Sequence, residues 1–417
     1  MIKRPHSEVL TMDAGHRHHI KSYLTAALGL ALALSLIVFP EDTYQASREG
    51  LKLWFEVLLP ALLPFFVTAE LLVRFGVVQL IGAVLQPVMY PLFRIPGAGA
   101  FALALGLASG YPLGAKITAD LRRSNVISRI EAERLVCFAN TAGPLFLAGA
   151  VAVGMLGLPE TALTLMLAHY ASTLMVGFIM RFYGSTEPER IFSAKKPSDK
   201  IDALFHARAD LSQFGTIFYE SVIKSFKSLV FIGGCITVFS VLSRMLSLAG
   251  IIPALARLAA SVLSYAGVNA DLAGAAISGI LEIDIGIHAI SKAKATLMQQ
   301  LVAISAVIGW SGLSVHAQVT AMLQGTDIRL KPYIIARIIH AICAGAAAAI
   351  LYRPASYIWE RLGITVPALA NLGLTFPSMP VILALSSTAA GLAVVLCLLL
   401  AFITNLAGRV VIVRFRR

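Results

Sequence analysis

Apolar runs long enough to cross a bilayer as α-helices recur along the chain, separated by short polar stretches. Two other stretches, 77–93 and 251–267, are amphipathic and flanked by Pro and Gly, which favours helices lying in the membrane interface. The first of these would also span a thin bilayer. The pattern predicts eight spanning helices, at 22–40, 51–75, 131–157, 159–182, 225–249, 296–324, 333–352 and 380–405.

Two glycine-rich stretches, 97–120 and 271–294, interrupt this pattern. The first contains GLASGYPLGAK at 106–116, which is too short to cross the membrane and return as two full spans. Glycine permits unwound backbone, and Pro112 removes a backbone donor. The stretch therefore predicts a re-entrant hairpin whose tip is SGYPLG. The alternative is a helix-packing motif, because Gly106, Gly110 and Gly114 recur at a spacing of four.

Composition supports a membrane protein. Of 417 residues, 58% are hydrophobic and 13% are charged, and the mean hydropathy is +0.81. A soluble domain carries about 25% charged residues. The net charge of +12 comes from Lys and Arg that collect in alternate loops, which predicts cytoplasmic termini by the positive-inside rule. No basic helix or aromatic-interleaved patch indicates nucleic-acid binding.

The chain divides at a charged, proline-containing linker, 183–224, and its two sides resemble each other. The pair Ser278-Gly279 lies 169 residues after Ser109-Gly110, and Gly312 lies 169 residues after Gly143. Three crossings between the repeats would invert the second one, as in many secondary transporters. The predicted fold is an all-α polytopic membrane protein with inverted repeats, two re-entrant hairpins and interrupted helices. Its predicted parts are a cytoplasmic tail (1–21), a first helix with an outer loop (22–50), the first repeat (51–182), the linker (183–224), the second repeat (225–352), and an outer loop with a C-terminal helix (353–417).

Short polar side chains beside the helix breakers are the candidate substrate ligands. FANTAGP at 138–144 and GWSGLS at 309–314 interrupt spans at equivalent points of the two repeats. The free amides and helix N-terminus of the first hairpin favour an anion, and Lys116 adds a positive charge. The alternative is that these groups make interhelical contacts. The predicted substrate-binding residues are Ser109, Gly110, Tyr111, Lys116, Asn140, Thr141, Ser278, Gly279, Ser311 and Gly312.

The second hairpin carries Glu282, Asp284 and His288 in SGILEIDIGIH. Carboxylates in an apolar segment are costly and are functional candidates for that reason. Asp284 and His288, at i and i+4, would share a helix face. We predict that these three residues bind a coupling proton or cation, unless the outer solution solvates them. Other intramembrane polar residues are expected to make packing or interfacial contacts: His169, His316, Gln318, Arg337 and His340.

No HExxH, GxSxG or GxxxxGK[ST] motif occurs, and no nucleophile is paired with a base. We therefore expect neither an enzyme nor a cofactor or metal site.

Three stretches, LLPALLPFFVTAELL (58–72), PLFRIPGAGAFALALGLASGYPLGAKITADLR (91–122) and EAERLVCFANTAGPLFLAGAVAVGMLG (131–157), carry a family resemblance. They resemble the sporulation integral membrane proteins of the YlbJ/SpoVV type, in the nucleoside-recognition (Gate) superfamily. The order of elements is also similar to that of concentrative nucleoside transporters, which are elevator-type trimers.

The resemblance implies a secondary transporter that moves dipicolinic acid, a small aromatic dianion, from the mother cell across the outer forespore membrane. A nucleoside permease, or a non-transporting membrane protein needed for spore assembly, are the alternatives. Replacing Lys116 by Ala or Glu is expected to abolish anion uptake and to leave membrane insertion intact.

Overall fold

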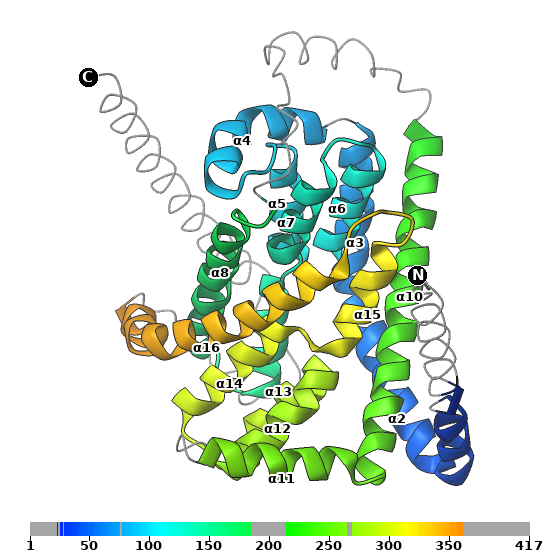
Figure 1. The fold of residues 1–417 in the computed structure, drawn as a ribbon, viewed down its shortest axis with the longest axis vertical. Helices are drawn as coiled ribbons and strands as arrows, with labels where there is room; N and C mark the ends of the chain where they lie inside the picture. The colour runs from blue at the N-terminus through cyan, green and yellow to red at the C-terminus, as the bar shows by residue number, and fades with distance from the viewer. Residues whose placement is uncertain are drawn as a thin grey trace, which may run out of the picture.

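The computed structural model describes residues 23, 26, 27, 29–75, 77–184, 214–264 and 269–361, and all regular elements among them are helical (Figure 1). The predicted tail, most of the linker and the last predicted span lie outside these residues. Within the described ranges, four helical stretches are long and apolar enough to cross a membrane: Thr161–Met180, Phe214–Leu248, Leu297–Met322 and Leu330–Arg353.

The first described helices run almost without a break: α2 (Pro40–Leu53), the π-helical turn η1 (Trp54–Leu58) and α3 (Leu59–Arg74). The predicted outer loop at 41–50 is therefore wrong, because these residues form α2. Pro40 opens the helix, and Glu41 and Asp42 lie in its first turn, where acidic side chains favour a helix N-terminus. Gly50 lets α2 pack closely on α10, since a Cβ there would lie 3.0 Å from the Thr237 backbone.

The rest of the first half follows the predicted order. Helix α4 (Val77–Phe93) precedes a hairpin, hereafter hairpin 1, of α5 (Gly99–Ser109) and α6 (Leu113–Arg123). The next span is interrupted as predicted, into α7 (Arg129–Ala139) and the π-helical η2 (Leu145–Met155), and α8 (Thr161–Met180) follows. Helix α7 begins at a capping box, in which Ser128 and Glu131 bond each other's backbone amides.

The second half contains the same elements in the same order. It consists of α10 (Phe214–Leu248), α11 (Ile251–Leu263), hairpin 2 of α12 (Ala270–Leu281) and α13 (Ile283–Lys292), the interrupted span α14 (Leu297–Trp310) and α15 (Gly312–Met322), and α16 (Leu330–Arg361).

Two predicted boundaries in this half are wrong. Residues 214–224 of the linker are the first turns of α10, held in part by stacking of Phe214 on Phe75 at 6.2 Å between ring centroids. Residues 353–361 continue α16 and do not begin an outer loop.

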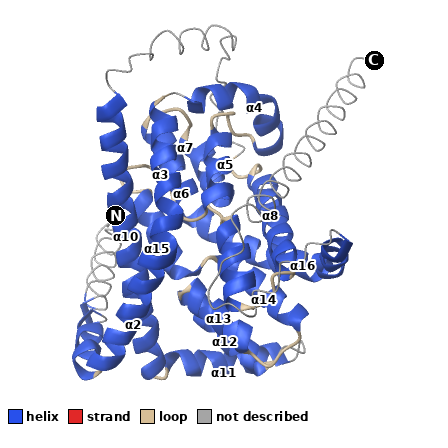
Figure 2. Cartoon of the chain, turned by 180° about the vertical axis from the view of Figure 1, so that it is seen from behind, coloured by secondary structure: helices blue, strands red, loops and turns tan. Residues whose placement is uncertain are grey.

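The equivalent elements of the two halves lie at opposite ends of the molecule. Figures 1 and 2 show α4 across one end and α11 across the other. The end of α6 lies beside the end of α15, because Arg123 donates to the Met322 carbonyl oxygen, and the first turns of α7 lie beside the loop after α15, because Arg329 donates to Glu133. The two interrupted spans therefore run in opposite directions, as two inverted copies would.

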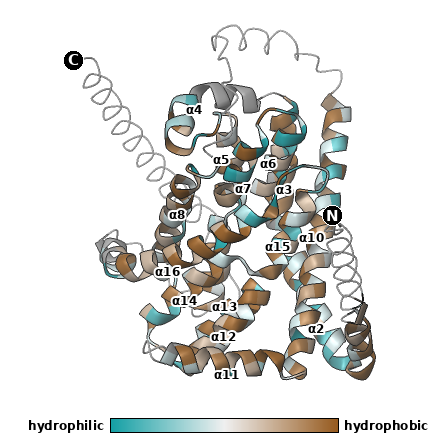
Figure 3. Ribbon diagram, in the orientation of Figure 1, coloured by the Kyte–Doolittle hydropathy of each residue, from teal (hydrophilic) through white to brown (hydrophobic). Residues whose placement is uncertain are grey.

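Hydropathy also differs between these two ends of the molecule. In Figure 3 hydrophobic residues cover α11 and much of α10, and hydrophilic residues gather where α3 and α6 end and α7 begins. Large apolar side chains on α10 and α16 are exposed, among them Val230, Val238, Ile338 and Ile342. Such surfaces suit contact with lipid.

Candidate functional site

The tip of hairpin 1 packs against the break in the first interrupted span (break 1, residues 140–144). Gly110 has φ 89°, a conformation that favours glycine. A Cβ on Gly110 would lie 2.7 Å from the Gly143 amide nitrogen, and a Cβ on Gly143 would lie 2.9 Å from the Ser109 carbonyl carbon. The predicted pair of tip and unwound helix is therefore in direct contact. The Ser109 hydroxyl, however, donates to its own helix at Leu105.

Hairpin 2 meets the second break in the same manner, at Ser311 and Gly312. Both residues have positive φ, and a Cβ on Gly312 would lie 3.1 Å from the Ile283 nitrogen. The predicted tip, SGILEIDIGIH (278–288), contains the observed turn at an extended Glu282, but its first residues, Ser278 and Gly279, still belong to α12, which continues to Leu281. Gly279 and Gly286 instead allow α12 and α13 to cross closely, since a Cβ on Gly286 would lie 2.2 Å from the Cα of Gly279.

Side chains from both halves converge beside break 1. The Asn140 amide donates to the Tyr333 hydroxyl at 3.0 Å. Arg337, one turn further along α16, donates through Nη1 to the Asn140 carbonyl oxygen at 3.0 Å and through Nη2 to the Cys137 carbonyl oxygen. The Tyr111 hydroxyl of hairpin 1 reaches across to the Ile308 carbonyl oxygen, at 2.8 Å, near the second break. This convergence, the central cluster, joins one hairpin tip, both breaks and α16.

Arg337 supplies the charge of the central cluster. Its side chain is fully buried, and no carboxylate in the described part of the chain forms an ion pair with it. Its Nε and the Oδ1 of Asn140 are buried without hydrogen-bond partners in the same part of the chain. A buried charge without a counter-charge is costly, so this position favours an anion.

The sequence does not single out Arg337, for which it predicts only a packing or interfacial contact. Its guanidinium does cap the carbonyl end of α7, as a cation at a helix C-terminus should. An isolated arginine within a predicted span was the available signal.

Thr141 and His169 organise the other side of break 1. The Nε2 atom of His169 accepts a hydrogen bond from the Ala142 amide at 3.0 Å and lies 2.5 Å from the Thr141 hydroxyl. Thr173 is a further neighbour of Thr141, at 3.3 Å. The predicted ligand Thr141 is thus engaged within the protein, and His169 satisfies backbone that the break leaves free.

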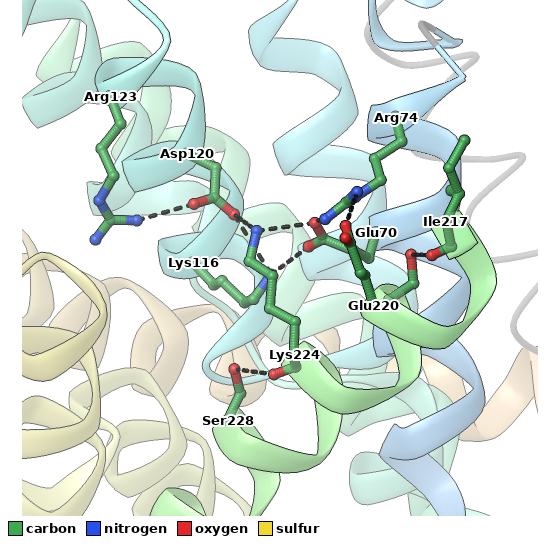
Figure 4. A network of polar contacts seen from close by, with 10 residues as sticks. Glu70, Arg74, Lys116, Asp120, Arg123, Ile217, Glu220, Lys224 and Ser228 are labelled. Atoms are coloured by element: carbon green, nitrogen blue, oxygen red, sulfur yellow. Dashed lines mark hydrogen bonds and ion pairs between the residues drawn. The ribbon is translucent and has the colours of Figure 1, made fainter. Parts of the chain in front are cut away.

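Lys116 has a different environment from the one predicted. It is buried, and its ammonium lies 3.1 Å from Glu70 on α3 and 3.4 Å from Asp120 on α6. Lys224 on α10 lies 2.8 Å from the same Glu70, so two carboxylates stand between two lysines (Figure 4). Arg74 extends this network at the surface. The expectation of a lysine free to meet the substrate is not met, since its charge is already balanced.

The three predicted coupling residues of hairpin 2 differ in how far they are exposed. Glu282 is buried, and its Oε2 has no hydrogen-bond partner among the described residues. The Oδ1 of Asp284 is in the same situation. His288 is exposed, and no hydrogen bond or ion pair joins it to Asp284 within the described ranges. Of the three predicted coupling residues, Glu282 and Asp284 have the burial that a proton or cation site needs.

Three comparisons with known proteins bear on this arrangement. Residues 55–186 match the family model described as nucleoside recognition (Gate), a range that includes hairpin 1 and break 1. The sporulation integral membrane protein YlbJ of Bacillus subtilis (strain 168) is 40% identical over 347 residues, covering 82% of this chain and 85% of that protein. A solved structure of a CNTnw variant in an outward-facing state matches with a TM-score of 0.39 and 17% identity, over 81% of this chain and 87% of that one.

Proposed function

Since this chain belongs to the family of the sporulation integral membrane protein YlbJ, we propose that it is a secondary transporter of a small organic anion, with dipicolinic acid as the first candidate. The observation that carries the proposal is Arg337, a buried guanidinium without a carboxylate partner in the described chain, at the junction of hairpin 1 and both breaks. In a spore former, the transporter would act in the outer forespore membrane of the mother cell.

Dipicolinate suits the chemistry of the central cluster. A guanidinium recognises a carboxylate with directed, charge-assisted hydrogen bonds. Tyr333 lies beside Arg337, whose Cζ is 5.4 Å from the Tyr333 ring centroid, and Trp310 borders the second break. Aromatic faces of this kind pack against a planar ring. The two hairpins would move with the bound anion against α3 and α10, and Glu282 with Asp284 would take a coupling proton or cation.

The decisive test is binding of dipicolinate and of uridine to the purified protein, measured by calorimetry. We expect dipicolinate to bind and uridine not to bind. Arg337→Lys keeps the charge but loses the planar fork, and should weaken dipicolinate about tenfold. Arg337→Gln removes the charge and should weaken it at least about a hundredfold, or about 2.7 kcal/mol.

The matched control is Arg353→Gln, because Arg353 is an exposed arginine on the same helix. We expect its affinity to stay within about twofold of the parent, in the range of surface substitutions. Monodispersity in size-exclusion chromatography checks that each variant is folded. Binding of uridine alone would instead make the protein a nucleoside permease. Binding of neither ligand, with sporulation intact in an Arg337→Gln strain, would support a non-transporting role.

A further inference from the structure

His316 is a buried histidine whose hydrogen bonds fix its tautomer. Its Nδ1 lies 2.7 Å from the carbonyl oxygen of Gly312, one turn back in α15. A carbonyl oxygen can only accept, so Nδ1 carries the hydrogen. A neutral ring therefore presents a lone pair at Nε2, and only a protonated ring presents a donor there.

This Nε2 atom is buried and has no hydrogen-bond partner among the described residues. The ring lies against Trp310, at 4.4 Å between centroids, and edge-on to Tyr333, at 5.3 Å. Tyr333 is the residue that Asn140 contacts and that Arg337 flanks. His316 thus borders the central cluster on the side of Tyr333. An orphaned polar atom in such a place is destabilising unless a ligand or water satisfies it.

Charge balance indicates which protonation state of His316 suits a bound dicarboxylate. Arg337 neutralises one carboxylate of a dicarboxylate, and the second would remain a buried charge. The lone pair of a neutral His316 would repel that carboxylate, whereas a protonated ring would donate to it. In the empty site a second positive charge beside Arg337 is unfavourable. We propose that His316 takes up one proton from solution when a dicarboxylate binds at Arg337, and releases it when the anion leaves.

This inference rests on the proposed function and makes the anion and the proton enter the site together. With the proton on His316, Glu282 and Asp284 are left to bind a coupling cation. The proton moves from water to Nε2, and no other bond forms or breaks. Helices α6, α10 and α12 pack against α15, and the His316 ring contacts Tyr333 of α16. The titratable and charged groups on these elements include Tyr333 and Arg337 of α16, Glu282 at the end of α12, Cys235 of α10, and the Lys116–Asp120 pair of α6. Among these, Glu282 is the competing proton acceptor, because its Oε2 also lacks a partner in the described chain.

The number of protons taken up is measured by titrating the purified full chain with dipicolinate in buffers of different ionisation enthalpy, at one pH near 7. We expect about one proton per anion bound. By linkage, the association constant should fall about tenfold for each unit by which the pH is raised in the range where the empty site is unprotonated. Dipicolinate binding without proton uptake would overturn the inference and leave the proposed function intact. Absence of dipicolinate binding would overturn both.

Two variants locate the proton. His316→Gln keeps an amide donor for the carboxylate but cannot titrate, so it should bind dipicolinate with no proton uptake and no dependence on pH. His316→Asn serves if that variant does not fold. Glu282→Gln should keep the uptake of one proton. Uptake that persists in His316→Gln, or that disappears only in Glu282→Gln, would overturn the assignment to His316.

Discussion

Lys116 and Arg337 are both buried cations, and their neighbours give them different roles. Lys116 has Glu70 and Asp120 within 3.4 Å, and Lys224 helps to balance the same two carboxylates. Arg337 has backbone carbonyl oxygens as its partners. Carbonyl groups orient a guanidinium without cancelling its charge. Lys116 therefore stabilises the contact of hairpin 1 with α3 and α10, and Arg337 retains a charge for a ligand.

Lys116→Ala should accordingly lower stability and spare binding. Removing one partner of a buried ion pair costs about 3–5 kcal/mol, and because Lys224 stays beside Glu70 we expect a smaller loss, about 1–3 kcal/mol. Thermal unfolding in detergent measures this loss. Dipicolinate affinity should change less than about threefold, since the hydrogen bonds and ion pairs of the Lys116 ammonium among the described residues go to Glu70 and Asp120 and not to the central cluster. A folded Lys116→Ala protein that no longer binds dipicolinate would show that Lys116 is a substrate ligand after all.

The sequence placed both residues in the membrane but assigned Lys116 to the substrate and Arg337 to packing or interfacial contacts. Asp120, four residues after Lys116, was visible as a helical neighbour, whereas Glu70 and Lys224 meet Lys116 only through tertiary packing. The same limit hid Arg337. Its partners at break 1 lie nearly 200 residues earlier, so no local pattern links them.

At the scale of elements, hairpin 1 shows that a re-entrant tip and a glycine packing motif are compatible. The Ala139 carbonyl oxygen, at the end of α7, fits between the two arms. A Cβ on Gly106 would lie 1.8 Å from this oxygen, and one on Gly114 would lie 1.9 Å from it. The glycines at spacing four thus pack hairpin 1 around the end of α7, next to break 1.

Gly114→Ala should therefore disrupt the site. The added methyl group meets backbone, which cannot rotate away, so we expect a loss of at least about 2 kcal/mol in stability and a fall in dipicolinate binding. The yield of monodisperse protein and its thermal midpoint report the effect. The matched control is Gly234→Ala in α10, where nothing lies within 4 Å of the new Cβ. Equal stability of the two variants would contradict this packing argument.

Element order was largely predictable, because breakers and apolar periodicity are local signals. The hairpins, both interrupted spans and α4 were expected near their observed positions. Two of the misplaced boundaries, at 41–50 and 214–224, share a cause, which is that polar residues extend a helix where a neighbouring helix pairs with them. In α2, Asp42 pairs with Arg244 of α10, and so a stretch expected to be loop continues as helix. Hairpin 2 turns at Glu282 without a glycine, which the register of Ser278-Gly279 could not indicate.

For the whole molecule, ion pairs at one end join the two halves. Arg122 at the end of α6 pairs with Asp327 between α15 and α16, at 2.8 Å. The Arg122 guanidinium, through its hydrogen bonds, lowers the pKa of Asp327. The Arg122–Asp327 ion pair therefore stabilises the folded protein above the ordinary pKa of an aspartate, and this stabilisation is lost as the pH falls through the lowered pKa. The basic loop after α6 and the loop before α16 therefore lie on the same side of the membrane.

An inverted arrangement of the two repeats would have a direct consequence for accessibility. Ser124, after α6, and Gln324, after α15, are exposed at the end where the halves are paired, and Lys294, after α13, is exposed near hairpin 2. In a background without the four native cysteines, Ser124→Cys and Gln324→Cys should react with a membrane-impermeant maleimide only from the cytoplasmic side. Lys294→Cys should react only from the outer side. Labelling of Ser124→Cys and Lys294→Cys from one side would exclude the inversion. Labelling of Ser124→Cys from outside would reverse the orientation derived from the basic loops while keeping the inverted repeat.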